Sequence, residues 1–339
     1  MAKVSIIIPC YNTEKTVRRA VKSVAHQSFR DLDIILVNDA STDGTGTILQ
    51  RLAESDSRIR VIAHDENLGV DFARFTGVRE SKTQYLCFLD ADDTMKKDAI
   101  ASLLNIAEKE DADIVEGASS RVLGRFGILK QRGHLKNRVI TPPELMDDFF
   151  ISFFGVNILG VTAWGKLYKR DLFDRSGIGP SGYNRGEDLI MNMKLFPYIR
   201  KYVTIDQEIV HYYYGGVTSS LDSSFYDCSK RQYFQKLEMI NQYGYTKAKR
   251  TTAIEMCNIL NTTIQQMLLA RLPYEEIHRF LEKEASSGFL EDISSIAGNG
   301  SAFVSIKKKN LDGIITAQQS RLWRIRLRRL FISIIANIL

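Results

Sequence analysis

The feature that most constrains the fold is a regular alternation of short apolar runs with helical segments in the amino-terminal third of the chain. The apolar runs have no repeating polar position, which is typical of strands that are buried on both faces. Such strands are expected at residues 4–8, 33–37, 59–63, 85–89 and 113–116. Strands of this kind, separated by helices, predict a parallel sheet with helices on both faces. The predicted fold class is therefore α/β, with a Rossmann-like, mostly parallel sheet.

The segments between these strands are predicted helices, and polar residues before them provide cap positions. The first helix is expected to be capped by Asn12 or Thr13 and to end near His26. The others are expected after Gly44 to about Glu54, and over 71–80 and 97–110.

Beyond residue 140 the pattern changes. It predicts a helix over 142–154, a helix that begins near Gly186, a strand over 209–214, and then helices over 225–243, 247–270 and 274–285. Residues 288–300 are expected to be less regular. The predicted domains are therefore 1–220, which carries the sheet, and a helical region over 221–339.

Composition bounds the class of protein. The chain has 339 residues, of which 44% are hydrophobic, as is ordinary for a globular protein with a sizeable core. Its four cysteines are widely spaced and form no CxxC pair, which favours a reducing compartment. Pro9 interrupts the first apolar run, so the start does not resemble a signal peptide, and no apolar run is long enough to span a bilayer. We therefore expect a cytoplasmic protein.

Three polar segments follow strands of the predicted sheet, at the point where each strand ends. They are Tyr11-Asn12, the segment 39–44, and Asp90-Ala91-Asp92-Asp93. In open parallel sheets, ligands bind beyond the carboxyl ends of the strands, where the strand order reverses. The three segments are therefore expected to meet at one rim.

Asp90 and Asp92 are spaced by one residue, and their carboxylates are suited to a hard divalent cation that also binds a diphosphate. The alternative is a helix amino terminus, where acidic residues such as Asp93 complement the dipole. Asp39 is placed to accept a hydrogen bond from a nucleobase or a ribose hydroxyl. The alternative there is a capped turn, and we assign that role to Asp43.

Two further candidates lie on loops. Tyr11 is placed to stack on a nucleobase, the alternative being a half-buried loop aromatic. Glu187 and Asp188 begin a predicted helix after a glycine-rich loop, so a carboxylate there is a candidate general base. The alternative is again complementarity to the helix dipole.

These segments occur in an order that resembles glycosyltransferase family 2, inverting enzymes with the GT-A fold, many of which build bacterial surface polysaccharides. The matching motifs are Val4–Asn12, Val37–Thr45, Asn67-Leu68-Gly69 with Arg74 and Gly77, Phe88–Asp93, and Gly186-Glu187-Asp188. The resemblance covers roughly residues 3–220.

The resemblance implies roles for individual residues. The donor nucleotide, usually with uracil as its base, would be bound by Pro9, Tyr11, Asn12, Asp39, Arg74, Asp90, Ala91 and Ser219. In that set Arg74 would lie near the base or the diphosphate, and Asp90 near the ribose or the metal. Asp92 would ligate Mn²⁺ or Mg²⁺, with His211 as a further ligand or, alternatively, a structural residue. Asp188 would be the catalytic base and Glu187 would orient the acceptor. Lys166 would belong to the acceptor-side wall.

The chain also departs from the family pattern. Relatives often carry an arginine after the tyrosine-rich strand, whereas here Gly215 and Gly216 follow. These glycines let the backbone approach a diphosphate, and Ser219 is placed to donate a hydrogen bond to it. Arg121 and Arg125 are candidates to replace the missing cation.

The carboxyl-terminal segment 321–335 alternates arginines with apolar residues at helical spacing, and the net charge of the chain is +6. This pattern favours an amphipathic helix on an anionic membrane surface, peripheral to the inner face of the cell membrane. The alternative is a helix that packs on the protein itself or on a second copy in a homo-oligomer. No nucleic-acid motif accompanies the charge.

The leading hypothesis is a metal-dependent, inverting glycosyltransferase that moves a sugar from a UDP-sugar to a hydroxyl group of a glycan or lipid-linked acceptor. One alternative is a nucleotidyltransferase, which usually needs a basic, glycine-rich loop after the first strand, and that loop is missing here. Another is a catalytically silent nucleotide-sugar-binding subunit, against which Asp92 and Asp188 argue.

Overall fold

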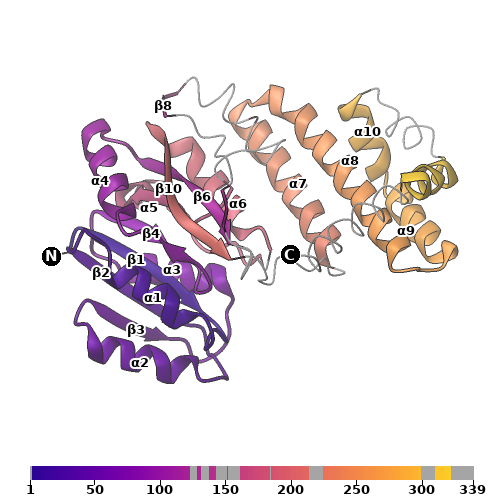
Figure 1. Cartoon of the computed structure of the whole chain (residues 1–339). Coiled ribbons are helices and arrows are strands. Elements are labelled where there is room, and N and C mark those ends of the chain that lie inside the picture. The colour runs from indigo at the N-terminus through magenta and orange to yellow at the C-terminus, as the bar shows by residue number, and fades with distance from the viewer. Residues whose placement is uncertain are drawn as a thin grey trace. The chain divides into compact units, whose positions relative to one another are not determined.

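The computed structural model describes residues 2–122, 128–130, 137–142, 151, 161–183, 185–213, 224–298 and 310–321. The chain divides into two compact units (Figure 1). The sheet unit comprises residues 1–149 and 158–219, and the helical unit comprises residues 150–157 and 220–339. The predictions for Ser219, Arg125, most of the helix over 142–154, and the tail beyond residue 321 lie outside the described residues.

The sheet unit is built on a single mixed sheet with the strand order β3-β2-β1-β4-β9-β6-β10-β5. Its strands are β1 (Val4–Cys10), β2 (Leu32–Asn38), β3 (Ile59–Ala63), β4 (Tyr85–Phe88), β5 (Thr94–Met95), β6 (Ile114–Val122), β7 (Ile128–Lys130), β8 (Arg138–Ile140), β9 (Lys166–Lys169) and β10 (Tyr202–Tyr213). The four strands from β3 to β4 are parallel, as the apolar runs predict. β9 is antiparallel to both β4 and β6 and joins the two halves of the sheet.

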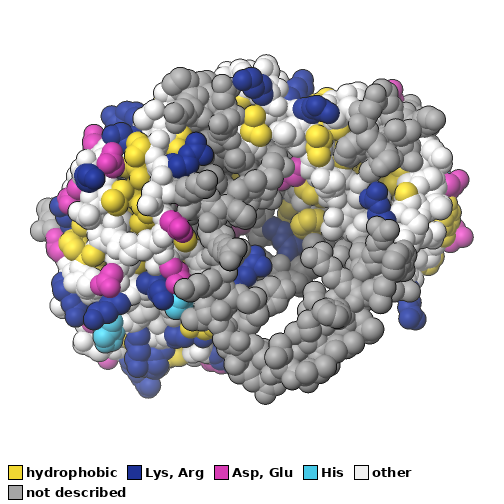
Figure 2. Space-filling view, turned by 45° about the horizontal axis from the view of Figure 1, so that its top comes forward, with side chains coloured by type: hydrophobic (Ala, Val, Ile, Leu, Met, Phe, Trp, Pro, Cys, Tyr) yellow, Lys and Arg dark blue, Asp and Glu magenta, His cyan; other side chains and the backbone are white. Residues whose placement is uncertain are grey.

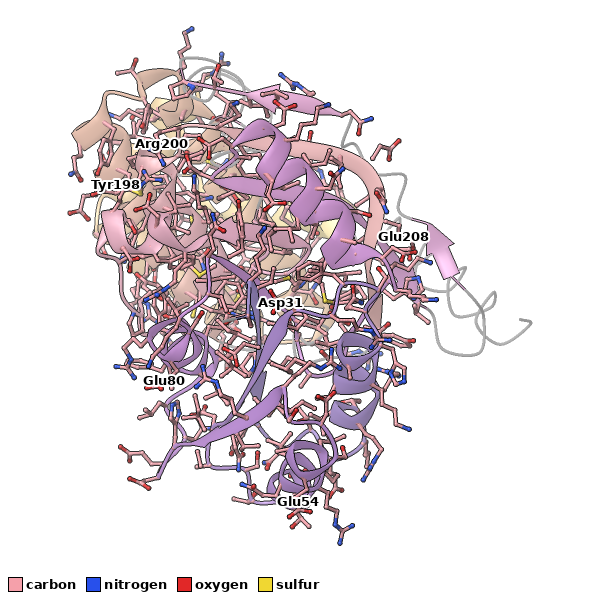
Figure 3. All side chains as sticks on the ribbon, turned by 90° about the vertical axis from the view of Figure 1, so that its left-hand side faces the viewer. Asp31, Glu54, Glu80, Tyr198, Arg200 and Glu208 are labelled. Atoms are coloured by element: carbon pink, nitrogen blue, oxygen red, sulfur yellow. The ribbon has the colours of Figure 1, made fainter. Side chains whose placement is uncertain are left out.

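Helices cover both faces of this sheet (Figure 1). The sheet unit contains α1 (Val17–Ala25), α2 (Thr45–Ser55), α3 (Val70–Glu80), α4 (Ala99–Glu110), α5 (Arg170–Ser176), α6 (Glu187–Leu195) and the short 3₁₀ helix η4 (Phe196–Tyr198). Apolar residues of α1, α2 and α4 pack with Ile6 and Ile8 of β1 on one face. On the other face, α3 lies so close to β1 that a Cβ on Gly77 would be 2.3 Å from Ile7 Cγ2. Figure 3 shows Glu80, at the end of α3, and Glu208, on β10, on opposite sides of the unit.

The first helix begins later than predicted. Thr16, rather than Asn12 or Thr13, is the cap of α1. The physical reason is that the earlier residues are bound to the next loop: Asn12 has a left-handed φ of 51°, and the Thr13 amide donates to Thr45 Oγ1 at 2.8 Å. Asn12 and Thr13 therefore lie outside the helix, bonded to the segment that follows β2.

The helical unit is built from α7 (Ser224–Tyr243), α8 (Thr246–Leu269), α9 (Tyr274–Ser286) and α10 (Phe289–Ala297), and residues 311–321 are also helical. The expectation of an irregular segment at 288–300 was wrong, because Gly288 caps α10 with a φ of 77° and Phe289, Leu290 and Ile293 then enter the core. Among the described residues, no helix is both long and apolar enough to cross a membrane.

Candidate active site

The polar segments that follow β1, β2 and β4 meet at one rim, as the sequence predicts. The Asn12 amide donates to Ser41 Oγ at 3.1 Å, and the Thr42 amide donates to Asn12 Oδ1 at 2.8 Å. Arg19 of α1 donates to the backbone carbonyl of Asp92, and its guanidinium lies 3.5 Å from the centre of the Tyr213 ring. The rim therefore joins the ends of β1, β2, β4 and β10.

The predicted nucleotide residues at the end of β1 differ in exposure. Pro9 is buried in β1 opposite Val37, and Ala91 is also buried. Tyr11 is 47% exposed, which leaves its ring available for a stacking partner. On the face of the sheet unit seen in Figure 2, acidic and basic side chains are interspersed, so the described surface there shows no patch of a single charge.

Asp39 lies just after β2 and is only 2% exposed. Its Oδ1 accepts from His64 Nδ1 at 2.7 Å and from the Leu68 amide at 3.0 Å, and its Oδ2 accepts from the Gly69 amide at 2.8 Å. Asp43, by contrast, accepts from the Thr45 amide at the start of α2, in keeping with its predicted capping role, although the cap position is Gly44. Sequence reasoning missed His64, because a lone histidine after a strand gives no signal.

The centre of the site is a cluster of three carboxylates around Arg74, which lies on α3 and is 3% exposed. Arg74 Nη2 donates to Asp90 at 2.8 Å, and Nη1 donates to Glu187 at 3.1 Å and to Asp188 at 2.5 Å. Burial lowers the pKa of this guanidinium, but the charges of Asp188, Asp90 and Glu187 outweigh it and raise the pKa above its usual value. Arg74 therefore binds Asp188, the predicted catalytic base, a contact that the sequence did not predict.

Asp188 lies in the first turn of α6, after Gly186, whose φ of 74° turns the chain into the helix. Its Oδ1 is bound by Arg74 and its Oδ2 accepts from the Ala163 amide at 2.9 Å. Burial raises the pKa of Asp188 to about 6, although Arg74 lowers it, and the charges of Glu187 and Asp90 add to the rise. A carboxyl with this pKa is ionised at neutral pH and is still basic enough to accept a proton.

A buried polar network supports the base from behind. One turn after Asp188, Asn192 donates to the backbone carbonyls of Asp188, Val161 and Thr162, and its Oδ1 accepts from the Tyr168 hydroxyl at 2.9 Å. This network fixes the start of α6 against β9.

Lys166 belongs to the same interior, and the prediction that it lines an acceptor-side wall was wrong. The residue is fully buried, its Nζ donates to the Thr162 carbonyl, and it lies 3.5 Å from Glu116 Oε1. Burial lowers its pKa, and the charges of Glu116 and Asp188 oppose that shift.

Asp71 is a second residue on α3 that sequence reasoning missed. It is 3% exposed, and its Oδ2 accepts from the Ser181 amide, from Ser181 Oγ at 2.7 Å and from the Gly182 amide at 3.2 Å. These bonds attach the glycine-rich segment that precedes α6 to the start of α3. The segment is therefore held in place where the sequence alone indicates a flexible loop.

The predicted metal residues are Asp92, which follows β4, and His211, which lies on β10. Burial raises the pKa of Asp92, and the charge of Asp90 adds to the effect. The neighbouring Asp93 is fully buried: burial raises its pKa to about 8, its Oδ1 accepts from the Tyr213 amide, and its Oδ2 has no hydrogen-bond partner among the described residues. Crowded, partly buried carboxylates of this kind are the oxygen donors that Mg²⁺ and Mn²⁺ prefer.

His211 has a different setting. Its Nε2 lies 3.4 Å from Glu208 Oε1, and its pKa is lowered by burial and by the charge of Lys96, with Glu208 opposing. Within the described part of the chain, no three His, Cys, Asp or Glu side chains are grouped as a metal site.

The comparisons with known proteins agree with one another. The family model described as "Glycosyl transferase family 2" matches residues 5–177. The "Uncharacterized glycosyltransferase EpsJ" of Bacillus subtilis is 31% identical over 72% of this chain and 72% of its own length. Glycosyltransferase GlyA of Streptococcus pneumoniae is 30% identical over 62% of this chain, but the match spans only 30% of GlyA.

The fold is also that of a solved structure. The crystal structure of Staphylococcus aureus TarS residues 1–349 in complex with UDP-GlcNAc superimposes with a TM-score of 0.72. The match covers 94% of this chain and 91% of the TarS chain, at 19% sequence identity.

Proposed function

Because the chain belongs to glycosyl transferase family 2, we propose that it moves a sugar from a nucleotide-sugar donor to a hydroxyl group of a glycan or lipid-linked acceptor, with inversion at the anomeric carbon. The observation that carries the proposal is the Arg74 cluster. It places a buried carboxylate with a raised pKa, Asp188, beside Asp90 at the strand rim. Sugar transfer requires a base at the acceptor hydroxyl and a donor bound close to it. Arg74 binds both Asp188 and Asp90, so it places the proposed base next to the proposed donor site.

Asp188 is the proposed general base. Its carboxylate accepts the proton of the acceptor hydroxyl as the oxygen attacks the anomeric carbon, on the side opposite the leaving nucleoside diphosphate. Arg74 and the Ala163 amide each hold one of its oxygens, so the carboxylate keeps one orientation. Glu187, bound by the same guanidinium, lies next to it and is proposed to orient the acceptor.

The rim is the proposed donor site. Tyr11 stacks on the nucleobase, Asp39 accepts a hydrogen bond from it, and Asp90 contacts the ribose. A UDP-sugar is proposed as the donor because TarS, which has the same fold, was crystallised with UDP-GlcNAc and with UDP. The burial of Asp39 supports this arrangement, because its carboxylate is held in one position by His64 and by the Leu68 and Gly69 amides.

The substitution Asp188→Asn tests the assignment of the base. The amide keeps the shape of the side chain but cannot take up a proton at neutral pH, so turnover should fall at least a hundredfold. UDP affinity, measured by calorimetric titration, should stay within about threefold of wild type, because Asp188 is not among the residues proposed to bind the nucleotide. Asp174→Asn, on the exposed side of α5, is the matched control and should leave both quantities unchanged.

Two results would contradict the proposal. Turnover that survives in Asp188→Asn removes the base assignment. Absence of UDP binding in the wild-type protein, with binding of another nucleoside diphosphate, removes the uridine assignment.

We further propose that Asp92 binds Mn²⁺ or Mg²⁺ together with the donor diphosphate. The cation would neutralise the charge that develops on the leaving diphosphate. The support is that Asp90, Asp92 and Asp93 follow one another after β4, where burial raises the pKa of Asp92 and Asp93 and the charges of the neighbouring aspartates add to the rise.

Asp92→Ala is expected to abolish the part of UDP affinity that depends on Mn²⁺. Titration of UDP with and without Mn²⁺ measures the gain in UDP affinity that Mn²⁺ provides. This gain should be at least tenfold in the wild type and absent in the variant. Equal Mn²⁺ dependence in both proteins would exclude Asp92 as the ligand.

A further inference from the structure

His64 connects the interior of the sheet unit to the carboxylate that is proposed to bind the nucleobase. Its side chain is 9% exposed, with Nδ1 2.7 Å from Asp39 Oδ1 and Nε2 3.0 Å from Thr76 Oγ1 on α3. Its backbone amide donates to the Asn38 carbonyl at 2.9 Å, which fixes the main chain beside the end of β2. Both the backbone and the ring of His64 are therefore fixed.

The direction of each hydrogen bond in this chain follows from the donors available. Arg79 Nη2 lies 3.1 Å from Thr76 Oγ1, and a guanidinium can only donate. Thr76 therefore accepts from Arg79 and still has its hydroxyl hydrogen to donate. An ionised carboxylate can only accept, so the ring hydrogen on His64 Nδ1 points at Asp39, and in the neutral ring Nε2 accepts from Thr76. Arg79, Thr76, His64 and Asp39 thus form a relay of hydrogen bonds that ends on Asp39.

The relay determines which acceptor position of Asp39 remains available. Oδ1 already receives two donors, His64 Nδ1 and the Leu68 amide, whereas Oδ2 receives only the Gly69 amide. One acceptor position of Oδ2 is left for a ligand. A uracil ring presents an N–H donor at N3, whereas a cytosine ring has an unprotonated acceptor nitrogen there. A fixed carboxylate therefore favours uracil and disfavours cytosine, because two acceptors would face each other.

We propose that His64 is a positioning residue that sets the nucleobase specificity of the donor site by fixing the Asp39 carboxylate. The inference rests on the proposed function, in which Asp39 contacts the base. Without the ring, Asp39 would be held by two backbone amides alone and could rotate. Rotation would let Asp39 avoid the clash with cytosine, so the preference for UDP over CDP would fall even if the fold were unchanged.

The test is calorimetric titration of UDP and of CDP on the full chain and three variants. His64→Leu removes the ring donors at similar volume, and the ratio of UDP affinity to CDP affinity should fall at least tenfold. His64→Asn keeps an N–H donor near the position of Nδ1 and should retain the ratio within about threefold. Thr76→Val does not touch Asp39 but removes the hydroxyl that orients the ring, so the ratio should fall by an intermediate amount. His26→Leu is the control, because His26 is an exposed histidine at the carboxyl end of α1.

The outcomes separate the two proposals. A wild-type protein without preference for UDP contradicts the proposed donor, and the inference falls with it. A wild-type preference that His64→Leu and Thr76→Val both leave intact contradicts the role of His64 alone. Equal losses of UDP and CDP affinity in both variants would mean that the ring only stabilises the loop. If His64→Leu does not fold, by circular dichroism, the Thr76→Val and His64→Asn pair decides the question.

Discussion

At the scale of single residues, the chemistry depends on how charge is balanced around Arg74. One guanidinium faces Asp90, Glu187 and Asp188, so the cluster holds more negative than positive charge when all three carboxylates are ionised. Lys166, the other buried cation that interacts with Asp188, is itself paired with Glu116. The basicity of Asp188 is therefore controlled chiefly by burial and by Arg74.

This balance predicts the pH dependence of the reaction. The base must be ionised, and its pKa is about 6, so kcat/KM should be flat near neutral pH and should fall below pH 6. The fall should be about tenfold per pH unit, as expected for a single essential carboxylate.

In Arg74→Gln the opposing positive charge is lost, the pKa of Asp188 rises further, and the acid limb should move to higher pH. Arg74→Lys keeps the charge and should keep the limb near its original position, with a lower kcat because an ammonium does not reproduce the planar arrangement of Nη1 and Nη2 that binds the three carboxylates.

The pH profile, measured beside UDP affinity, distinguishes this role from the nucleotide contact that the sequence predicts for Arg74. Loss of UDP affinity in both variants, with the acid limb unchanged, would restore the nucleotide contact and remove the effect on the base.

The sequence identifies some of these residues and conceals others for a physical reason. Asp90 and Asp188 lie in motifs that resemble the family, one after a buried strand and one at the start of a helix, so the sequence marks both as candidates. The role of His64 depends on its contacts with Asp39 and Thr76, which only the fold brings to either side of its ring. Lys166 was misjudged because a lysine is seldom buried, and its partner Glu116 lies on a different strand.

At the scale of elements, α3 organises the site. Along a single helix, Asp71 holds the segment before α6, Arg74 holds the carboxylates, and Thr76 orients His64. The position of α3 on the sheet is determined by Gly77, which leaves no space for a side chain against Ile7.

Gly77→Ala should therefore damage both stability and activity. The new methyl group would overlap Ile7 and force α3 away from β1, and overpacking of this kind costs about 1–3 kcal/mol. The free energy of unfolding, measured by urea titration, should fall by that amount, and kcat should fall with it because Arg74 moves. Gly179→Ala is the control, since a Cβ there would meet nothing within 4 Å. Full activity and stability in Gly77→Ala would show that α3 can shift without disturbing the cluster.

Helices and strands with one clear hydrophobic periodicity could be predicted, whereas strands with charged residues or irregular pairing could not. The buried strands β1 to β4 and the helices α7 to α9 lie close to their predicted ranges. β9 was missed because its four residues include two lysines, and β10 was predicted only over its second half because the pairing shifts between Ile205 and Val210. These irregular strands are where the parallel half of the sheet joins the rest.

At the scale of the whole molecule, the proposed donor and acceptor sides belong to separate parts of the sequence. The rim follows the first four strands, whereas the base lies on α6 and is 114 residues away from Arg74. The family resemblance implied a role for each residue, but neither it nor the spacing placed α6 against α3. The antiparallel strand β9 does so, since its neighbour in the chain, Ala163, binds Asp188 directly.

The long span between Arg74 and Asp188 also orders events during synthesis. Arg74 and Asp90 are translated before Asp188, which follows Arg74 by 114 residues, and β10, which completes the rim, is translated after α6. A nascent chain that ends before α6 therefore lacks both the proposed base and the last strand of the rim. We expect neither half of the proposed reaction to be available until the sheet unit has been translated through β10.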